Sequence, residues 1–237
     1  MKKRILCILM IMLSLLVITG CTKARQSAID FKKEYEAVNN KTVRGDYKYR
    51  VLNISDNNPY VKVDPKEIVK KIDNKETFYL YVGDPLCPWC RSGIEKMIEV
   101  AQKEGIKDIY YIDFWDDNHN EILRDLYEVQ TEGKKNVVVK TKEATAEYIK
   151  ILEAVKDYAQ DYTITKDDKT YDVNTKRIFG GDHFYFENGI CKKYVSLRSE
   201  KLAGAFDELT TEVLKDQETN FSNFFAKANT CTSNSNC

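Results

Sequence analysis

The chain has 237 residues, of which 43% are hydrophobic, and that proportion is enough to build a core. Its 37 basic and 37 acidic residues balance, so the charge gives no reason to expect a nucleic acid or another polyanion as partner. The length fits one domain with an insertion.

The first residues have the pattern of an export signal. Residues 1–4 are Met-Lys-Lys-Arg, and the apolar run 5–18 that follows is too short to span a membrane as a helix. The run closes with Ile-Thr-Gly-Cys at 18–21, which resembles the lipobox of bacterial lipoproteins. The resemblance implies that 1–20 is a signal peptide and that Cys21 carries lipid. The alternatives are an ordinary signal peptide or a membrane anchor helix. In each case the domain is exported to a compartment where disulfides persist.

The cysteines are too few to build the domain from disulfides. There are seven, of which Cys7 leaves with the signal and Cys21 is the lipid site. The other five are an odd number, so at least one is free or forms an intermolecular bond. We expect Cys231 and Cys237 to pair with each other, and Cys191 to be a small buried hydrophobic residue. The remaining two are Cys87 and Cys90.

Before these two cysteines, residues 21–64 form a polar segment next to the lipid anchor. Within it, 29–38 has the spacing of a short helix and 47–54 alternates like a strand.

A strand–helix–strand unit follows a helix at 65–73, which has proline at its first position. The run 77–83 is apolar almost throughout and predicts a strand buried on both faces. Residues 91–104 have helical spacing and end before a glycine, and 108–114 is the next strand. Such a βαβ unit is expected to be parallel.

Residues 115–176 are predicted to be an insertion, mainly helical. Within it we expect a helix at 122–129, a short strand at 137–139, a second helix at 144–159 and a hairpin or polar loop at 163–173.

The C-terminal part is expected to close the domain. The segment 183–197 contains Asn188-Gly189, a strong hairpin signal. A final helix is predicted at 205–228, followed by a small polar tail at 229–237.

Cys87 and Cys90 lie two residues apart, at the junction of the buried strand and the helix. There Cys87 meets free backbone N–H groups and the positive end of the helix dipole, which favour its thiolate. Arg91 adds a positive charge nearby, and Asp84 opposes it. Cys90, one turn inside the helix, can attack a mixed disulfide formed at Cys87. Half of a zinc site and a structural disulfide are the alternatives, but zinc needs four ligands.

The segments "FYLYVGDPLCPWCRSGIEKMIEVAQKEGIKDIYYIDF" and "RIFGGDHFYFENGICKKYV" resemble the thioredoxin superfamily. Within that superfamily the chain resembles thioredoxin-like lipoproteins and bacteriocin-transport-accessory proteins. The resemblance implies an α/β fold with a central mixed sheet flanked by helices over 65–228. It also implies that Cys87 attacks, that Cys90 resolves, and that the two form a redox-active disulfide.

Two positions depart from the pattern of that superfamily. Gly181 stands where the cis-proline is expected, and Tyr81 stands where a buried carboxylate often lies, six residues before Cys87. Asp84 and Glu76 are the carboxylates that could take over its role.

Other residues near the cysteines have roles to test. Pro88, Trp89 and Gly181 are the expected substrate-binding residues, with Trp89 as an apolar docking surface. Without the proline, the cysteines could also be open to a metal with His183 as third ligand.

The function expected is that of a membrane-anchored thiol–disulfide oxidoreductase that needs no cofactor. Its partners would be the thiols or disulfides of exported proteins, with electrons from an unidentified membrane protein. A metal-binding lipoprotein and a non-catalytic accessory protein of transport or secretion are the alternatives.

Overall fold

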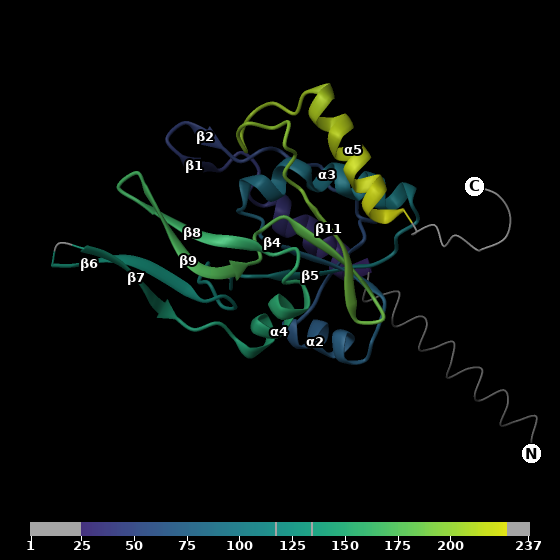
Figure 1. Cartoon of the computed structure of the whole chain (residues 1–237). Coiled ribbons are helices and arrows are strands. Elements are labelled where there is room, and N and C mark those ends of the chain that lie inside the picture. Colours follow the sequence, from purple (N-terminus) through teal and green to yellow (C-terminus); the bar gives the residue numbers. More distant parts are fainter. Residues whose placement is uncertain (1–24, 117, 134, 227–237) are drawn as a thin grey trace, which may run out of the picture.

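The computed structural model describes residues 25–116, 118–133 and 135–226 (Figure 1). The predicted signal peptide, Cys21, and the tail with Cys231 and Cys237 lie outside these ranges. Within them, no helix is both long enough and apolar enough to cross a membrane.

A mixed sheet of five strands forms the centre of the molecule, in the order β11-β10-β4-β5-β3. Strands β3, β4 and β5 run parallel, and the hairpin β10–β11 pairs antiparallel with β4. The strand β4 is the middle one and is buried almost throughout, as its apolar sequence predicts. The bounds are β3 Tyr60–Lys62, β4 Phe78–Gly83, β5 Ile109–Asp113, β10 Asp182–Glu187 and β11 Ile190–Ser196.

Helices cover both faces of this sheet (Figure 1). One face carries the helix 25–36 with α3 (Pro88–Lys103) and α5 (Thr211–Phe225), which pack together in one apolar core. The other face carries α2 (Pro65–Asp73) and α4 (Ala146–Ala154) over a second core. This arrangement confirms an α/β fold with a central mixed sheet flanked by helices.

The predicted strand 47–54 is wrong over most of its length. Only β2 (Tyr47–Lys48) is a strand, paired with β1 (Thr42–Arg44) in a small hairpin. The alternation has another cause, because Leu52 and Ile54 point into the core from a segment that has no strand partner. The true edge strand β3 was missed, since its three residues carry too short a pattern.

The insertion is mainly β-hairpin, so the helix predicted at 122–129 is wrong. Two long hairpins, β6 (Leu126–Glu132) with β7 (Lys135–Lys142) and β8 (Gln160–Lys166) with β9 (Lys169–Arg177), project from one side of the sheet (Figure 1). Leu126 and Val129 have helical spacing, but pairing with β7 satisfies the backbone of that segment instead. The expected strand at 137–139 and the hairpin at 163–173 are both present in these arms.

Helix ends are set by capping residues that the apolar periodicity did not reveal. Thr210 caps α5, so this helix begins at Thr211 and not at the predicted residue 205. Thr145 caps α4 in the same way, and α4 ends at Ala154, well before residue 159. The helix α3 begins three residues before the predicted start, because Cys87 is its N-cap.

Candidate active site

Cys87 lies where the buried strand β4 leads into α3. It is the N-cap of this helix, and Pro88 follows at the first helical position, where a backbone N–H is not needed. The backbone N–H of Cys90 donates a hydrogen bond to Cys87 Sγ at 3.2 Å. Cys87 is partly exposed as a residue, whereas Cys90 is fully buried. Both cysteines are in the dithiol form in this structure.

The pKa values of the two thiols are shifted in opposite directions, down for Cys87 and up for Cys90. A hydrogen bond from the Cys90 side chain, followed by the backbone N–H groups of Cys90 and Trp89, lowers the pKa of Cys87. Burial and the desolvation it brings raise the pKa of Cys87 in part, and so does the charge of Asp84, as predicted. For Cys90, burial is the main cause of a pKa well above the ordinary value, and the neighbouring Cys87 adds to it. Cys87 is therefore the better nucleophile.

Two consecutive glycines, Gly180 and Gly181, directly precede β10 and face the sulfurs. Strand β10 runs antiparallel to β4, so its first residues lie beside the end of β4 and the cysteines that follow it. A Cβ on Gly180 would lie 3.2 Å from Cys90 Sγ and 3.3 Å from Cys87 Sγ. Gly181, the expected contact, is farther away: its Cβ would lie 3.9 Å from Cys90 Sγ. Gly180 is thus the closer of the two to the thiols, and the sequence analysis missed it.

Gly181 has a backbone shape that suits glycine. Its φ is +106°, and the described residues contain no cis peptide bond. Its N–H donates to Val82 O at 2.9 Å, and its carbonyl accepts from Leu197 N at 3.0 Å. The residue therefore joins β4 to the segment after β11, behind the cysteines.

Tyr81 places a phenol hydroxyl, instead of a carboxylate, beside Cys90. The ring is fully buried, and its hydroxyl lies 2.7 Å from the hydroxyl of Tyr35 on the helix 25–36. A side-chain hydrogen bond from Tyr81 lowers the pKa of Cys90, against the larger effect of burial. Of the two carboxylates considered above, Glu76 precedes β4, at the strand end far from the cysteines, and pairs with Lys71 at 3.0 Å.

Asp84 does lie next to the cysteine loop, where it lines a polar cleft of about 310 Å³. Its carboxylate accepts a hydrogen bond from Leu86 N at 2.7 Å and thereby shapes the loop before Cys87. The neighbouring strand ends in Asp113, whose pKa burial raises to about 6. Burial raises the pKa of Asp84 as well. Pro85 and Leu86 complete the wall of the cleft on the side of the cysteines.

A second hollow, apolar and about 520 Å³ in volume, begins at Pro88. Its walls are the β1–β2 hairpin and the loop before α5, and Tyr47 contacts Phe206 across it, with ring centroids 5.0 Å apart. We call it the hairpin groove, and its apolar lining consists of Val43, Tyr47, Pro88 and Phe206.

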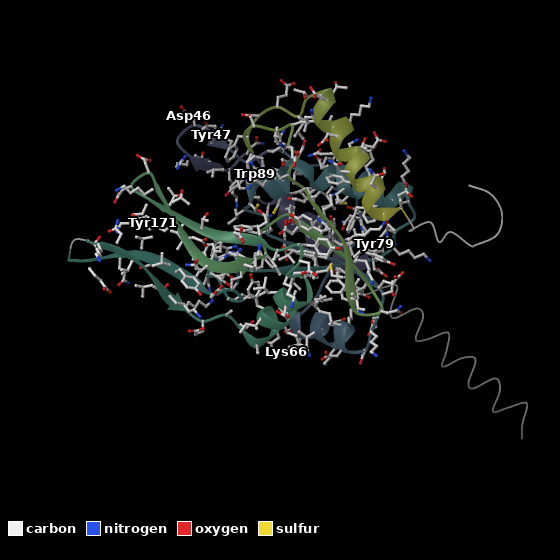
Figure 2. All side chains as sticks on the ribbon, viewed as in Figure 1. Asp46, Tyr47, Lys66, Tyr79, Trp89 and Tyr171 are labelled. Atoms are coloured by element: carbon white, nitrogen blue, oxygen red, sulfur yellow. The ribbon has the colours of Figure 1, made fainter. Side chains whose placement is uncertain are left out.

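Trp89, between the two cysteines, is half-buried. The guanidinium of Arg198 lies 4.5 Å from the centre of its ring. Trp89, on α3, and Tyr47, on the β1–β2 hairpin, are both labelled in Figure 2. Pro88, which lines the hairpin groove, lies in the chain between Cys87 and Trp89.

Arg91 has a different role from the one predicted. Its guanidinium is buried and donates to Tyr35 O at 2.7 Å, Arg50 O at 2.6 Å and Pro85 O at 3.2 Å. A further bond, of 2.5 Å, goes to Asn39 Oδ1. Arg91 thus binds the segment 35–50 to the cysteine loop, with its cation surrounded by neutral oxygen atoms.

His183 is engaged by other residues and does not complete a metal site. It is fully buried, its Nε2 lies 2.9 Å from Tyr60 Oη, and its Nδ1 lies 3.2 Å from Gly181 O. Burial lowers its pKa to about 3, so the ring is neutral. Among the described residues, no three His, Cys, Asp or Glu side chains are grouped as metal ligands. The geometry thus gives the metal alternative no support in this part of the chain.

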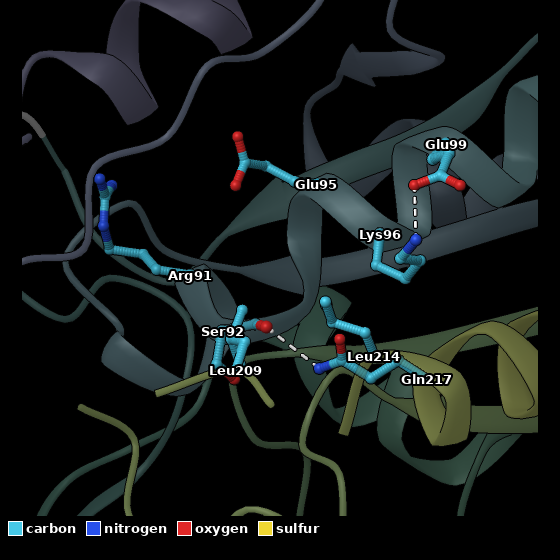
Figure 3. Close-up of a pocket in the computed structure, with 8 residues that line it drawn as sticks. All are labelled: Arg91, Ser92, Glu95, Lys96, Glu99, Leu209, Leu214 and Gln217. Carbon is cyan, nitrogen blue, oxygen red and sulfur yellow. Dashed lines mark hydrogen bonds and ion pairs between the residues drawn. The ribbon is translucent and has the colours of Figure 1, made fainter. Parts of the chain in front are cut away.

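A further cavity, of about 240 Å³, lies between α3 and α5 and is distinct from the thiol site (Figure 3). Gln217 donates to Ser92 O at 3.0 Å across it, and Lys96 pairs with Glu99 at 2.6 Å. Neither cysteine lines it, so it contributes helix packing and not sulfur chemistry.

Cys191 is half-buried on β11, and burial raises its pKa to about 12. Such a thiol is a poor nucleophile at neutral pH.

No protein-family model, no curated protein and no solved structure matches this chain. The inferences about its function therefore rest on the geometry described above.

Proposed function

We propose that this protein is a thiol–disulfide oxidoreductase of the thioredoxin type that acts on exported proteins. The observation that carries the proposal is the pair of unlike thiols at the start of α3. Cys87 is a partly exposed N-cap with a lowered pKa, and Cys90 is buried one turn later with a raised one. An attacking and a resolving thiol need this asymmetry.

The sheet supports the thioredoxin-type architecture. The parallel strands β5 and β3 lie on one side of β4, and the antiparallel hairpin β10–β11 lies on the other. This is the strand order expected for that fold. The cysteines follow the central strand, and the glycine pair meets them from β10. The two hairpin arms are an addition to this architecture.

The reaction balances without a cofactor. Cys87 thiolate attacks a substrate disulfide, forming a mixed disulfide and releasing one substrate thiolate. Cys90 then attacks Cys87 Sγ, which forms the Cys87–Cys90 disulfide and releases the second substrate sulfur as a thiol, with the proton that Cys90 gives up. The substrate gains two electrons and the protein loses two. The reverse sequence oxidises a dithiol, and a membrane electron partner would restore the starting form.

The surroundings of Cys87 indicate the class of substrate. The hairpin groove is lined by Pro88, the residue directly after the proposed attacking cysteine and directly before Trp89. Tyr47 keeps 56% of its surface exposed there. We propose that the groove holds an apolar side chain near the cysteine of an unfolded exported protein, with Gly180 and Gly181 leaving room for its backbone.

Trapping tests this function. In Cys90→Ser, Cys87 can still attack but no thiol resolves the adduct, so mixed disulfides with exported proteins should accumulate in cells. In the matched control, Cys87→Ser, they should not. Non-reducing electrophoresis followed by mass spectrometry identifies the adducts. If Cys90→Ser captures nothing, the oxidoreductase proposal fails, and the non-catalytic accessory function takes its place.

We also propose that Cys21 anchors the domain to the outer face of the cell membrane through lipid. The basis is the sequence pattern at 18–21 alone. Cys21→Ala should abolish incorporation of a labelled fatty acid and alter processing of the signal peptide. A Cys21→Ala protein that still carries the label would exclude this anchor.

A further inference from the structure

We propose that Arg50 is a positioning residue that determines substrate specificity. It holds the two walls of the hairpin groove together, and the groove thereby selects polypeptides that have an apolar side chain beside the reacting cysteine. The proposal rests on the proposed function, since it concerns how a substrate binds before Cys87 attacks it.

The walls of the groove come from segments that lie far apart in the chain. They are the β1–β2 hairpin and the loop before α5 (Figure 1), and across the groove Tyr47 contacts Phe206 with ring centroids 5.0 Å apart. Seven large hydrophobic residues are exposed in the part of the chain that the structure describes, and three of them, Val43, Tyr47 and Phe206, line this one groove. Such a gathering of exposed apolar side chains is typical of a binding surface.

The β1–β2 hairpin gains little stability from its own packing. Every residue of its two strands is exposed, and a two-stranded hairpin by itself is at most marginally stable in water. The position of this wall therefore depends on the contacts that the hairpin and the residues after it make with the rest of the domain.

Arg50 supplies a bond between the two walls. It lies two residues after β2, and its Nη2 donates a hydrogen bond to Asp207 O at 2.6 Å. Asp207 lines the opposite wall, directly after Phe206. A hydrogen bond from a charged donor is stronger than one between neutral groups, so this one side chain holds the end of the hairpin to the loop before α5.

Arg91 fixes the same residue to the helix of the cysteines. Its Nη2 donates to Arg50 O at 2.6 Å, and its Nη1 donates to Pro85 O at 3.2 Å. Arg91 lies on α3 one turn after Pro88, which itself lines the groove. Arg50 is thus joined to α3 through its carbonyl and to the far wall through its guanidinium. A substitution at 50 removes only the second of these links, because the carbonyl remains in every variant.

The occupant that fits the groove is a segment of an unfolded exported polypeptide. The volume of about 520 Å³ lies in the usual range of ligand pockets, and the charged residues of the lining, Arg44 and Asp207, have opposite signs. The charges therefore favour neither an anion nor a cation, whereas the apolar lining favours an apolar side chain. Because Pro88 directly follows Cys87, that side chain should belong to a residue close to the substrate cysteine.

Two peptides that differ at one position test this specificity. Each has one cysteine joined by a disulfide to nitrothiobenzoate, with phenylalanine or serine beside that cysteine. Cys87 thiolate attacks the peptide sulfur, the S–S bond breaks, and nitrothiobenzoate leaves as a coloured thiolate. The full chain is used in detergent, in excess over the peptide, with the five cysteines other than Cys87 and Cys90 replaced by serine. The rate measured against protein concentration gives a half-saturating concentration and a maximal rate for each peptide.

For the wild-type groove we expect the half-saturating concentration to be about tenfold lower with the phenylalanine peptide than with the serine peptide, at similar maximal rates. In Arg50→Ala the value for the phenylalanine peptide should rise about fivefold. The value for the serine peptide and both maximal rates should stay unchanged. Arg50→Lys keeps a charged donor and should restore part of the preference. Comparing variants with the same peptide cancels the partition of that peptide into detergent.

The matched control is Arg25→Ala, which removes an exposed arginine on the helix 25–36 that does not line the groove. It should keep the wild-type preference. If Arg50→Ala does not fold, Arg50→Gln, which keeps the aliphatic stem, replaces it with the same expected outcome. Tyr47→Ser removes a ring that is 56% exposed from the hairpin wall and should also abolish the preference.

Equal half-saturating concentrations of the two peptides with the wild-type groove would overturn the inference. A second copy of the chain or its own tail in the groove would give that result. A preference that survives in Arg50→Ala or in Tyr47→Ser would overturn it too, and so would an equal loss for both peptides, which indicates a general structural change. The trapping experiment is independent of these values. Adducts in Cys90→Ser without a peptide preference would leave the proposed function standing and remove only the role of Arg50.

Discussion

The backbone N–H of Cys90 donates to Cys87 Sγ across 3.2 Å, so the first turn of α3 favours a thiolate at Cys87, the group that begins the proposed reaction. The same turn buries Cys90, and burial, together with the neighbouring Cys87, holds the pKa of the Cys90 thiol well above its ordinary value. In the proposed reaction a mixed disulfide would remove the charge on Cys87. Because an uncharged disulfide at Cys87 no longer opposes ionisation of Cys90, the first step prepares the second.

The first prediction concerns the thiol of Cys87. In a chain whose only cysteines are Cys87 and Cys90, the alkylation rate of Cys87 against pH should have a midpoint below about 8.5, the value of a free thiol. Since the Cys90 side chain is the largest cause of the lowered pKa, Cys90→Ala should raise the midpoint. Cys90→Ser, which retains a donor, should raise it less. A wild-type midpoint at or above that of a free thiol would contradict the prediction.

The second prediction separates the two glycines. Gly180→Ala introduces a Cβ against both sulfurs, at 3.2 Å from Cys90 Sγ and 3.3 Å from Cys87 Sγ, and should slow alkylation of Cys87 about tenfold with little loss of stability. Gly181→Ala forces a side chain into φ +106° and should lower the free energy of unfolding by roughly 1–3 kcal/mol. Urea denaturation and alkylation kinetics on both variants check this. Equal effects of the two variants on rate would contradict the assignment of Gly180 as the closer contact.

The third prediction concerns Arg91, whose buried guanidinium binds oxygen atoms of three separate segments. Arg91→Lys retains the charge but cannot make the forked contacts, so the free energy of unfolding should fall by about 3 kcal/mol. Urea denaturation measures the loss. The control, Arg44→Lys on the exposed hairpin β1, should change stability by less than about 0.5 kcal/mol. A similar small change at Arg91 would show that its contacts do not stabilise the fold.

The fourth prediction concerns Asp182, which accepts hydrogen bonds from Phe179 N and Tyr194 Oη, both at 3.0 Å. Burial raises its pKa in the folded state to about 7, whereas the unfolded value is about 3.9. Between these values the folded state holds the extra proton, so this group's contribution to stability is full below about pH 4 and falls as pH rises towards 7.

Asp182→Asn removes that proton equilibrium. The stability of the variant relative to wild type should therefore be greater at pH 7.5 than at pH 4.5, by roughly 1–3 kcal/mol. Any cost of losing one acceptor oxygen is the same at both pH values and cancels in the difference. Asp108→Asn, at an exposed carboxyl before β5, serves as control and should show no such difference. Equal relative stabilities at the two pH values would contradict the prediction.

Local pattern was enough to predict the unit that carries the thiols. The apolar run 77–83, the helical spacing after it and the next strand at 108–114 correspond to β4, α3 and β5 within a few residues. The same holds for α2 and for the hairpin at Asn188-Gly189. In each case neighbouring residues carry the apolar pattern that predicts the element, and a proline or glycine marks its boundary.

Pattern failed where pairing with a distant segment decides the structure. The spacing of Leu126 and Val129 fits a helix, but the partner strand β7 makes this segment β6. Leu52 and Ile54 alternate because both enter the core, without a strand beside them.

The sequence by itself determined which two thiols lie close together, because a short helix start fixes Cys87 and Cys90 relative to each other. Only the tertiary structure decided what surrounds them. Tyr35, Tyr81 and Gly180 come from a helix, a strand and a loop far apart in the chain. The hydroxyls of the two tyrosines meet, and Gly180 faces both sulfurs, because of how the sheet orders its strands and how the helices pack on it. The spacing of residues along the chain cannot predict such contacts, because each one is formed by packing between distant segments across the core.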